Sequence, residues 1–307
     1  MDLLDPSLYA DGSIHRHFRQ LEPVSWQPRP GYWAVLGYPE AHRVLSEPAN
    51  FSSAFGTGIV SDARAHFVSL NLSDPPVHTP LRRHLSHWLK TLQPDFHPEI
   101  EPLRGLPRQT LQAILQIGET QASQLQQLAV RIAYAPHKAT WRQAEDELVV
   151  QLALLHTPLG MHLSTTDRLY LLRLLVLSGL ESTTTALASL CQHRPQPALI
   201  EEMLRLHPPI QRFGRRVMRD LRLGPCDLKE GDRVLVFFAA ANRDPRVFSQ
   251  PHQWRLGRPP HLSFGAGPHR CPGASLARRQ LHWLAPNPPP PPERYYRSSF
   301  SAGPNFG

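Results

Sequence analysis

The ten-residue stretch FGAGPHRCPG, from Phe264 to Gly273, constrains the fold of this chain more than any other part of its sequence. It places Cys271 in a loop with Gly265 and other glycines, and the apolar, arginine-bearing run over 274–284 predicts a helix. Glycine lets a backbone turn sharply and approach a flat ligand. The free N–H groups and partial positive charge at a helix start stabilise a nearby thiolate. A haem iron accepts such a ligand, so the stretch suits a haem-thiolate site; a free, buried cysteine in a glycine-rich turn is the alternative, and the commoner one for an isolated cysteine.

Composition narrows the class of protein. A chain of 307 residues with 41% hydrophobic content can bury one large core or two small ones. Its three cysteines, at 191, 226 and 271, are too few and too scattered for a disulfide framework or a CxxC zinc site. We therefore expect a reducing, cytoplasmic setting. The first residues show no signal-peptide pattern, and the most apolar stretch, 169–180, contains Arg173 and is too short to cross a bilayer, so no membrane anchor is expected.

The net charge of +8, from 33 Lys and Arg against 25 Asp and Glu, raises the question of an anionic partner. The sequence has no Lys/Arg run, RNA-binding aromatic signature or zinc-finger spacing, so nucleic acid is not expected. A solvated surface explains most of the charge, and a basic face for an acidic electron-transfer protein is the alternative. Proline is abundant, and the segment 286–307 begins with a proline run that predicts an extended or disordered tail.

Hydrophobic periodicity predicts short helices over 13–21 and 38–45, with a strand over 33–36 between them. From 96 to 144 the pattern weakens, and the Gln-rich segments 103–115 and 125–132 suggest surface helices that carry no chemistry. A helix is expected from 147 to 155, and strands with glycine turns are expected over 210–238.

Two basic residues stand four apart at the start of another predicted helix. In the stretch DPPVHTPLRR, from Asp74 to Arg83, an acid and two prolines begin the helix. His78 and Arg82 then lie on the same face, from which both can donate hydrogen bonds to one carboxylate. A solvated pair of surface side chains is the alternative.

The segment 169–187 predicts a central, buried helix, because it is apolar nearly all round. Gly179, Glu181 and the four hydroxyl side chains over 182–185 interrupt it. A buried carboxylate is costly without a partner, and Ser and Thr side chains compete for helix carbonyls and can bend the helix. Together these residues could open a groove beside a ligand and supply a proton path, or they could mark a locally frayed helix.

A further pair, Glu202 and Arg205, lies three apart on a helix that ends before two prolines at 208 and 209. On a surface such an ion pair contributes a few tenths of a kcal/mol and indicates little about function.

Taken together, these stretches resemble the motifs of the cytochrome P450 family, of the soluble bacterial type. The segment 264–273 matches the haem-binding loop F-x-x-G-x-H-x-C-x-G at every fixed position, His78 and Arg82 match the HxxxR helix, and Glu202 and Arg205 match ExxR. The segment 178–183 is similar to the oxygen-activation motif. It departs from that motif at Ser178, in place of a small apolar residue, and at Ser182, in place of threonine.

The resemblance implies roles for the matched residues. Cys271 would be the axial ligand of the haem iron, Phe264 would shield its sulfur, and four basic side chains would neutralise the haem propionates. The implied cofactor-binding set is Phe264, Gly265, His269, Cys271, Gly273, His78, Arg82 and Arg215. The implied catalytic set, which relays protons, is Glu181, Ser182 and Thr183. The implied ion network behind the loop is Glu202, Arg205 and Arg258.

The implied function is that of a haem-thiolate monooxygenase. Such an enzyme inserts one oxygen atom from O2 into a small apolar organic substrate, with heme b (iron protoporphyrin IX) as cofactor. Electrons would come ultimately from NAD(P)H through a ferredoxin or flavodoxin-type donor with its reductase. Candidate pocket residues are Phe55, Ile59, Val60, Phe67, Ile210, Gln211 and Phe213.

The implied fold is mainly α with small β-sheets, a cytochrome P450-like fold that holds haem between the central helix and the Cys271 loop. We expect residues 1–285 to form the haem domain and 286–307 to form the tail. Relative to the family, the chain is shortened in the middle, before Glu202 and towards the C-terminus. The alternative is therefore a family member that binds haem but is catalytically impaired.

Overall fold

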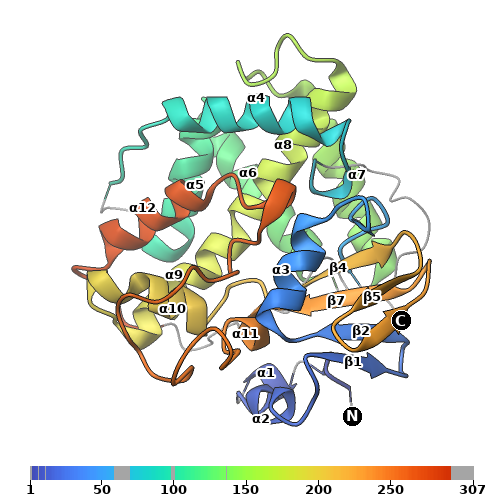
Figure 1. Cartoon of the computed structure of the whole chain (residues 1–307). Coiled ribbons are helices and arrows are strands. Elements are labelled where there is room, and N and C mark those ends of the chain that lie inside the picture. The colour runs from blue at the N-terminus through green and yellow to red at the C-terminus, as the bar shows by residue number, and fades with distance from the viewer. Residues whose placement is uncertain are drawn as a thin grey trace.

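The computed structural model describes residues 2–5, 7–10, 12–58, 70–97, 101–135 and 137–291. Figure 1 shows a helical part above and to the left of a smaller sheet part. The helices are α1 Ser7–Ala10, α2 Ile14–Phe18, α3 Tyr38–Ser46, α4 His78–Thr91, α5 Pro102–Leu115, α6 Glu119–Ala133, α7 Lys138–Leu154, α8 Thr165–Gly179, α9 Glu181–His193, α10 Ile200–Leu206, α11 Phe238–Ala241 and α12 Ala274–Leu284, with 3-10 turns η1 Leu70–Leu72, η2 Pro197–Leu199 and η3 Gly267–His269. This mainly helical fold with small sheets confirms the predicted fold class.

Five strands form the larger sheet in the order β1-β2-β7-β4-β3, and two form a separate hairpin. Their bounds are β1 Val24–Gln27, β2 Tyr32–Val35, β3 Phe51–Ser52, β4 Arg212–Val217, β5 Leu221–Leu223, β6 Cys226–Leu228 and β7 Arg233–Phe237. The central strand β7 is buried along its whole length, as expected for a strand covered on both faces. It pairs parallel to β2 and antiparallel to β4, and its partnership with β4 places Arg215 opposite Val234.

The main helical core lies where α4, α5, α6, α7 and α8 meet. Leu85, Leu115, Leu148 and Leu172 are fully buried there. The predicted helices over 103–115 and 125–132 are present as α5 and α6, but the prediction that they lie on the surface was wrong. Their glutamines indicated solvent exposure, yet their leucines form an apolar stripe wide enough to pack against α8.

The central helix is present but divided. Leu180 separates α8 from α9, so the predicted continuous helix over 169–187 consists of two segments. The Ser182 hydroxyl donates to the Ser178 carbonyl (2.6 Å) and the Thr184 hydroxyl donates to the Leu180 carbonyl (3.0 Å). Such bonds to the preceding turn compete with the helix backbone and bend it, which accounts for the break.

The two segments together, Thr165–His193, are long and apolar enough to cross a membrane by length and composition. However, 72% of their most apolar window is buried inside the protein, as in the core helix of a soluble protein. Of the predicted tail, residues 286–291 follow α12, and the Pro289 carbonyl accepts a hydrogen bond from Arg194 (3.1 Å). The remainder lies outside the described residues.

Candidate functional site

A large cavity separates the central helix from the Cys271 loop. Its volume is about 1410 Å³, counting the part open to solvent, and it is bounded by side chains of α5, α8, α9, α12 and the loop. Gly179 faces it from one side and Gly273 from the other. A Cβ atom built on either glycine would meet no atom within 4 Å. The two glycines therefore leave free space on opposite sides of the cavity, as a flat ligand requires.

The loop that carries Cys271 has a tightly determined backbone. Gly265 and Gly267 adopt positive φ angles of 69° and 64°, and a Cβ on Gly267 would lie 2.6 Å from the Leu45 carbonyl oxygen. The Cys271 N–H donates to the Phe264 carbonyl (2.7 Å), which closes the loop. These contacts direct the Cys271 side chain towards the cavity, which it lines together with Phe264.

The Cys271 sulfur is surrounded by protein on every side except the cavity, through which solvent reaches it. Burial raises the pKa of this thiol. The Gly273 N–H, which donates a hydrogen bond to the sulfur, and the charges of Arg82 and Arg278 oppose that rise. These groups partly offset the cost of burying a thiolate at Cys271.

Buried cations gather at one edge of the cavity. Arg215, on β4, is 3% exposed, and its recorded side-chain bond is to the neighbouring Gly214 carbonyl (2.8 Å). Within the described residues it forms no ion pair. Burial lowers its pKa to about 10, although Asp74 acts in the opposite direction. A buried guanidinium without a carboxylate partner indicates a place for an anionic ligand.

Two histidines complete this basic edge. The rings of His78 and His269 lie 4.3 Å apart, and His78 Nδ1 is buried without a hydrogen-bond partner in the described part of the chain. Burial, His269 and Arg82 lower the pKa of His78 to about 4. Arg82 also donates to the Arg270 carbonyl, which links α4 to the Cys271 loop. Of the four predicted basic residues, Arg215 and His269 line the cavity, and His78 and Arg82 lie near His269 without lining it.

Asp74 has a role at this edge that the sequence did not reveal. Its carboxylate accepts hydrogen bonds from the Ser53 N–H (3.1 Å) and hydroxyl (2.9 Å), and it lies 3.6 Å from His269 Nε2. Burial would raise the pKa of Asp74, but hydrogen bonds from His269, Ser52 and Ser53 hold it well below its usual range. The carboxylate therefore orients His269. Its sequence pattern indicated only a helix start.

The central helix presents hydroxyls, and not its carboxylate, to the cavity. Ser182 and Thr183 line the cavity, whereas Glu181 does not. Glu181 is 1% exposed, accepts a hydrogen bond from the Tyr134 hydroxyl (3.1 Å) and lies 3.9 Å from Arg104. Burial raises its pKa, with Arg104 and Tyr134 acting against the rise. Of the three predicted proton-relay residues, Ser182 and Thr183 line the cavity, and Glu181 instead contacts Tyr134.

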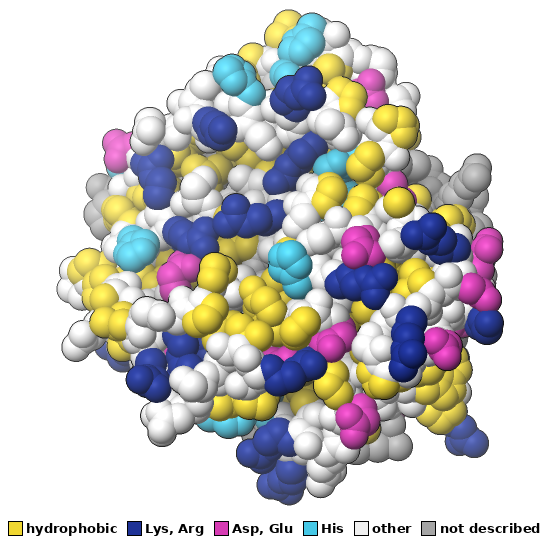
Figure 2. Space-filling view, viewed as in Figure 1, with side chains coloured by type: hydrophobic (Ala, Val, Ile, Leu, Met, Phe, Trp, Pro, Cys, Tyr) yellow, Lys and Arg dark blue, Asp and Glu magenta, His cyan; other side chains and the backbone are white. Residues whose placement is uncertain are grey.

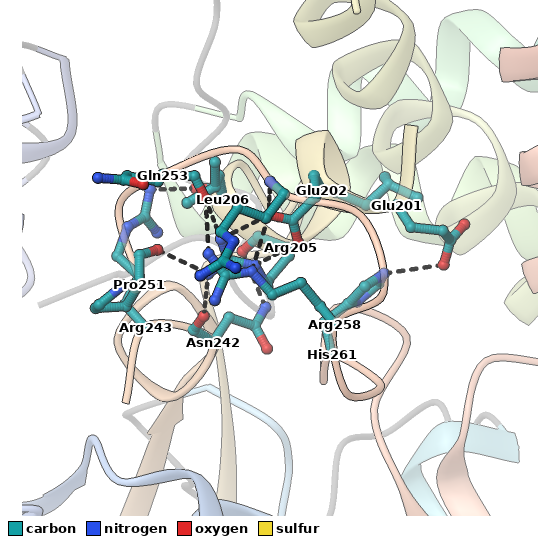
Figure 3. Close-up of polar contacts among 12 residues, drawn as sticks. Glu201, Glu202, Arg205, Leu206, Asn242, Arg243, Pro251, Gln253, Arg258 and His261 are labelled. Carbon is teal, nitrogen blue, oxygen red and sulfur yellow. Dashed lines mark hydrogen bonds and ion pairs between the residues drawn. The ribbon is translucent and has the colours of Figure 1, made fainter. Parts of the chain in front are cut away.

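The ion network behind the loop is buried and extensive. Arg205 is 1% exposed and donates to both oxygens of Glu202 (2.7 and 2.9 Å). Arg258 approaches the same carboxylate at 3.4 Å. Figure 3 shows further bonds from the Arg205 guanidinium to carbonyls of the segment that leads to the loop, among them Asn242 (2.7 Å) and Pro251 (2.8 Å). The network therefore anchors that segment to α10.

Apolar side chains form the rest of the cavity. They come from α4, α5 and α8, and they include Leu89, Pro107, Leu111, Ile114, Leu174 and Leu175. Sequence reasoning missed the contribution of α5, although the leucine spacing over 103–115 could have indicated an apolar face. Of the predicted pocket residues, Ile210 and Phe213 line this cavity, Phe55 and Gln211 do not, and Ile59, Val60 and Phe67 lie outside the described residues.

The residues present fit a flat, dianionic group that contains a metal. One thiol faces the cavity, two glycines leave room for a planar body, and the buried Arg215 guanidinium and His78 Nδ1 have hydrogen-bonding capacity for an anion. Haem has a planar body, two propionates and an iron that accepts a thiolate, so the site defines a haem-thiolate protein.

Comparison with known proteins shows which family the chain resembles. The family model described as "Cytochrome P450" matches residues 196–285. Cytochrome P450 126 of Mycobacterium tuberculosis is 28% identical over 368 residues, which cover 92% of this chain and 89% of the relative. The beta-dihydromenaquinone-9 omega-hydroxylase of Mycobacterium bovis is 27% identical, over 91% of this chain and 70% of the relative. The chain resembles cytochrome P450 proteins over nearly its whole length, and these relatives support a monooxygenase of that class, an oxidoreductase.

Solved structures agree on the fold. The cytochrome P450 enzyme CYP109B1 from Bacillus subtilis superposes with a TM-score of 0.72 at 23% identity, covering 93% of this chain and 91% of the other. The hydroxylase HmtN superposes with a TM-score of 0.74 at 24% identity, covering 94% of each chain.

The same comparison measures the internal shortening. Since 92% of 307 residues is about 282, the 368-residue alignment with cytochrome P450 126 leaves about 86 positions without a residue of this chain. The prediction that the chain is shorter than its relatives is confirmed. Nothing in the comparisons supports the alternative of a catalytically impaired member.

Proposed function

We propose that this chain binds heme b through Cys271 and inserts one oxygen atom from O2 into a small apolar organic molecule, with electrons supplied by separate proteins. The observation that carries the proposal is the position of Cys271, which faces the Ser182 and Thr183 hydroxyls across a cavity edged by buried cations. When bound, haem would supply the activation of O2 and the transfer of oxygen to carbon.

The loop residues would hold the cofactor from one side. The Gly273 N–H and the charges of Arg82 and Arg278 support the Cys271 thiolate. The Phe264 ring lies against Arg278, whose central carbon is 4.4 Å from the ring centre, and this contact would orient the ring for shielding the sulfur. Gly265 supplies the positive φ angle that the loop needs.

The basic edge would bind the two propionates. Arg215 and His78 each have donor capacity that the described protein does not use, and Arg82 and His269 flank them. The Ser53 hydroxyl contacts His269 Nε2 (3.1 Å), and Asp74, which accepts from Ser53, lies 3.6 Å from the same nitrogen, so the two residues hold His269 in place. Neutralising both propionates at this edge would also remove the cost of burying the Arg215 charge.

Residues of the central helix would relay protons to the cavity. Ser182 and Thr183 are the protic groups of α9 at the cavity surface, and Glu181 is a carboxylate of raised pKa on the same turn. We infer that Glu181 exchanges protons with solvent on the α6 side and that the two hydroxyls pass them to the cavity. Ser182 lacks the methyl group of threonine, so its rotamer is held only by its bond to the Ser178 carbonyl.

The cavity chemistry supports an apolar substrate. Leucine and isoleucine side chains of α5 and α8 would exclude water and offer no charge to a substrate. One relative is a hydroxylase of a dihydromenaquinone, and its name supports hydroxylation as the reaction type.

Charge on the surface near Cys271 supports an acidic electron donor. Arg82, Arg270 and Arg278 all act on the thiol from the loop side of the protein. Figure 2 shows a band of Lys and Arg side chains on the face that carries α12 and α4. A ferredoxin or flavodoxin-type donor is acidic and would be steered to this face, with its reductase passing on electrons from NAD(P)H in the cytoplasm.

The test is the absorption spectrum of the reduced protein with carbon monoxide. The wild type should show the red-shifted Soret band typical of a thiolate ligand, and Cys271→Ser should lose that band. Cys226→Ser is the matched control, since Cys226 lies on β6 and lines no part of the cavity. An unchanged spectrum in Cys271→Ser would exclude Cys271 as the ligand.

A further inference from the structure

Given the proposed function, on which this assignment rests, we propose that Tyr134 is the residue through which protons enter from solvent and reach Glu181. Tyr134 follows the last turn of α6, and α6 packs against both segments of the central helix. Neither Tyr134 nor Glu181 lines the haem cavity. Protons would therefore reach Glu181 from the outer surface of the protein and not through the cavity. Tyr134 acts on the reaction only through Glu181, so it is a positioning residue.

Glu181 needs a relay because its carboxyl group does not reach solvent. The residue is 1% exposed, and its Oε1 atom is buried without a hydrogen-bond partner in the described part of the chain. Burial raises the pKa of this carboxyl group. A carboxyl group enclosed in this way exchanges its proton with a group that lies within hydrogen-bonding reach.

Among the described residues, two side chains act on the pKa of Glu181, and only one of them can carry a proton. Arg104 of α5 lies 3.9 Å from Oε1, and the Tyr134 hydroxyl donates a hydrogen bond of 3.1 Å to Oε2. A guanidinium has no acceptor atom and stays protonated, whereas a phenol both accepts and donates a proton. Tyr134 is therefore the relay that these contacts allow.

Tyr134 joins this buried carboxyl group to the surface. The residue is 41% exposed, although its hydroxyl is bonded to a side chain that is buried. The direction of the bond suits inward transfer, because the phenol is the donor. In the balanced step, the phenol oxygen accepts a proton from a hydronium ion as its own proton passes to Glu181 Oε2. The hydronium becomes water, the carboxylate becomes a carboxylic acid, and the phenol is neutral before and after.

Contacts between α5 and α6 hold the two side chains around Glu181. Gln126 of α6 donates from Nε2 to the Arg104 carbonyl (2.9 Å), which ties the two elements together. Arg104 and Tyr134 then act on Glu181 in the same direction, since each favours the carboxylate against the effect of burial. Their opposition keeps the carboxyl group able to lose a proton as well as to take one.

The first test is the pH dependence of urea unfolding of the haem-loaded protein. Tyr134→Phe removes the hydroxyl and keeps the ring, so the pKa of Glu181 should rise further. The fall in stability above a pH of about 4.3 should then become larger and extend to higher pH. A purely structural role would lower stability equally at every pH. In Glu181→Gln, adding Tyr134→Phe should not change the pH profile. Tyr170→Phe is the matched control, because Tyr170 lies on α8 and does not act on Glu181.

The second test is oxygen consumption by the haem-loaded protein in H2O and in D2O, with a surrogate ferredoxin and its reductase and without substrate. Tyr134→Phe should slow consumption on the order of tenfold and enlarge the solvent isotope effect, and Tyr170→Phe should do neither. Equal behaviour of these two variants in both tests would overturn the proposal. A slowdown in Arg104→Gln that is absent from Tyr134→Phe would also overturn it, because protons would then enter through water beside Arg104.

The carbon monoxide spectrum separates this result from the haem assignment. Each variant should keep the spectrum of the wild type, because Tyr134, Arg104 and Tyr170 do not line the cavity. A wild type without the thiolate band would refute the haem assignment. A normal band with wild-type oxygen consumption in Tyr134→Phe would refute only the relay.

Discussion

Replacing Arg205 by methionine should destabilise the protein more than any surface substitution, because it leaves a buried carboxylate without its main partner. Arg205 and Glu202 are 1% and 4% exposed, and two hydrogen bonds of 2.7 and 2.9 Å join them. Methionine keeps much of the side-chain volume, so the change tests charge and hydrogen bonding and creates little cavity. Glu202 would retain only the Arg255 N–H (3.1 Å) and Arg258 at 3.4 Å.

The loss in free energy of unfolding follows from the number of partners that Arg205→Met removes. Removing one member of a buried ion pair costs about 3–5 kcal/mol. The Asn242 and Pro251 carbonyls also lose their donor, so the upper part of that range is expected. Since whole domains are stable by only about 5–15 kcal/mol, the loss is a large share of the total. It corresponds to a fall in Tm on the order of 10 °C.

Chemical unfolding by urea measures the change, with Lys229→Ala as the control. Lys229 forms an exposed pair with Asp220, so its removal should leave the unfolding midpoint nearly unchanged. The double variant Glu202→Gln/Arg205→Met should be more stable than Arg205→Met alone, because it removes the unpaired charge. A double variant as unstable as the sum of the two single changes would refute the reasoning about charge burial.

Further predictions concern the other buried groups. The pKa of Glu202 is depressed in the folded protein, so its ionised form stabilises the fold above the unfolded pKa of about 4.3, and this stabilisation is lost as the pH falls. In Glu202→Gln, the free energy of unfolding measured with urea should therefore fall less steeply at acid pH. The pKa of Glu181 is raised, so stability should fall as the pH rises above about 4.3, and Glu181→Gln should remove that decline. Gln280 Oε1 is buried without a partner in the described part of the chain, so Gln280→Leu should leave apo-protein stability unchanged or raise it by about 1 kcal/mol in thermal unfolding. Gly179→Phe should fold but retain far less haem per mole by absorbance, because the ring would fill the cavity space beside Gly179.

The haem loop could be predicted in detail because its chemistry is local. Gly265 provides a backbone turn and Cys271 provides a thiol, and both belong to one short segment. The residue types in that segment are therefore enough to predict them. The Glu202–Arg205 pair is similar, since a spacing of three on a helix determines that the side chains can meet. Whether the pair is buried could not be derived from that spacing, because the carbonyls that surround Arg205 come from 242 to 253.

The direction of Glu181 and the role of α5 could not be predicted for a different reason. Each step along a helix turns the side chain by about 100°, so Glu181, Ser182 and Thr183 need not all face one cavity. Which of them does so depends on the helix break at Leu180 and on the packing of α6, where Tyr134 follows the last turn. The apolar stripe of α5 was visible in the sequence, but the surface against which it packs was not.

Removing a segment that forms the basic edge should cost more free energy than removing a helix that only covers the cavity. The proposed haem edge draws buried basic side chains from distant parts of the chain: His78 on α4, Arg215 on β4 and His269 beside the loop. Removing any one of these segments would leave the remaining charges or the ligand without a partner, at several kcal/mol. A helix that covers the cavity contributes mainly apolar area, and α5 can supply such area through Leu111 and Ile114. A chain that leaves about 86 positions of that alignment without a residue can therefore keep the residues proposed to contact haem, and the shortening should weaken substrate enclosure before it weakens haem binding.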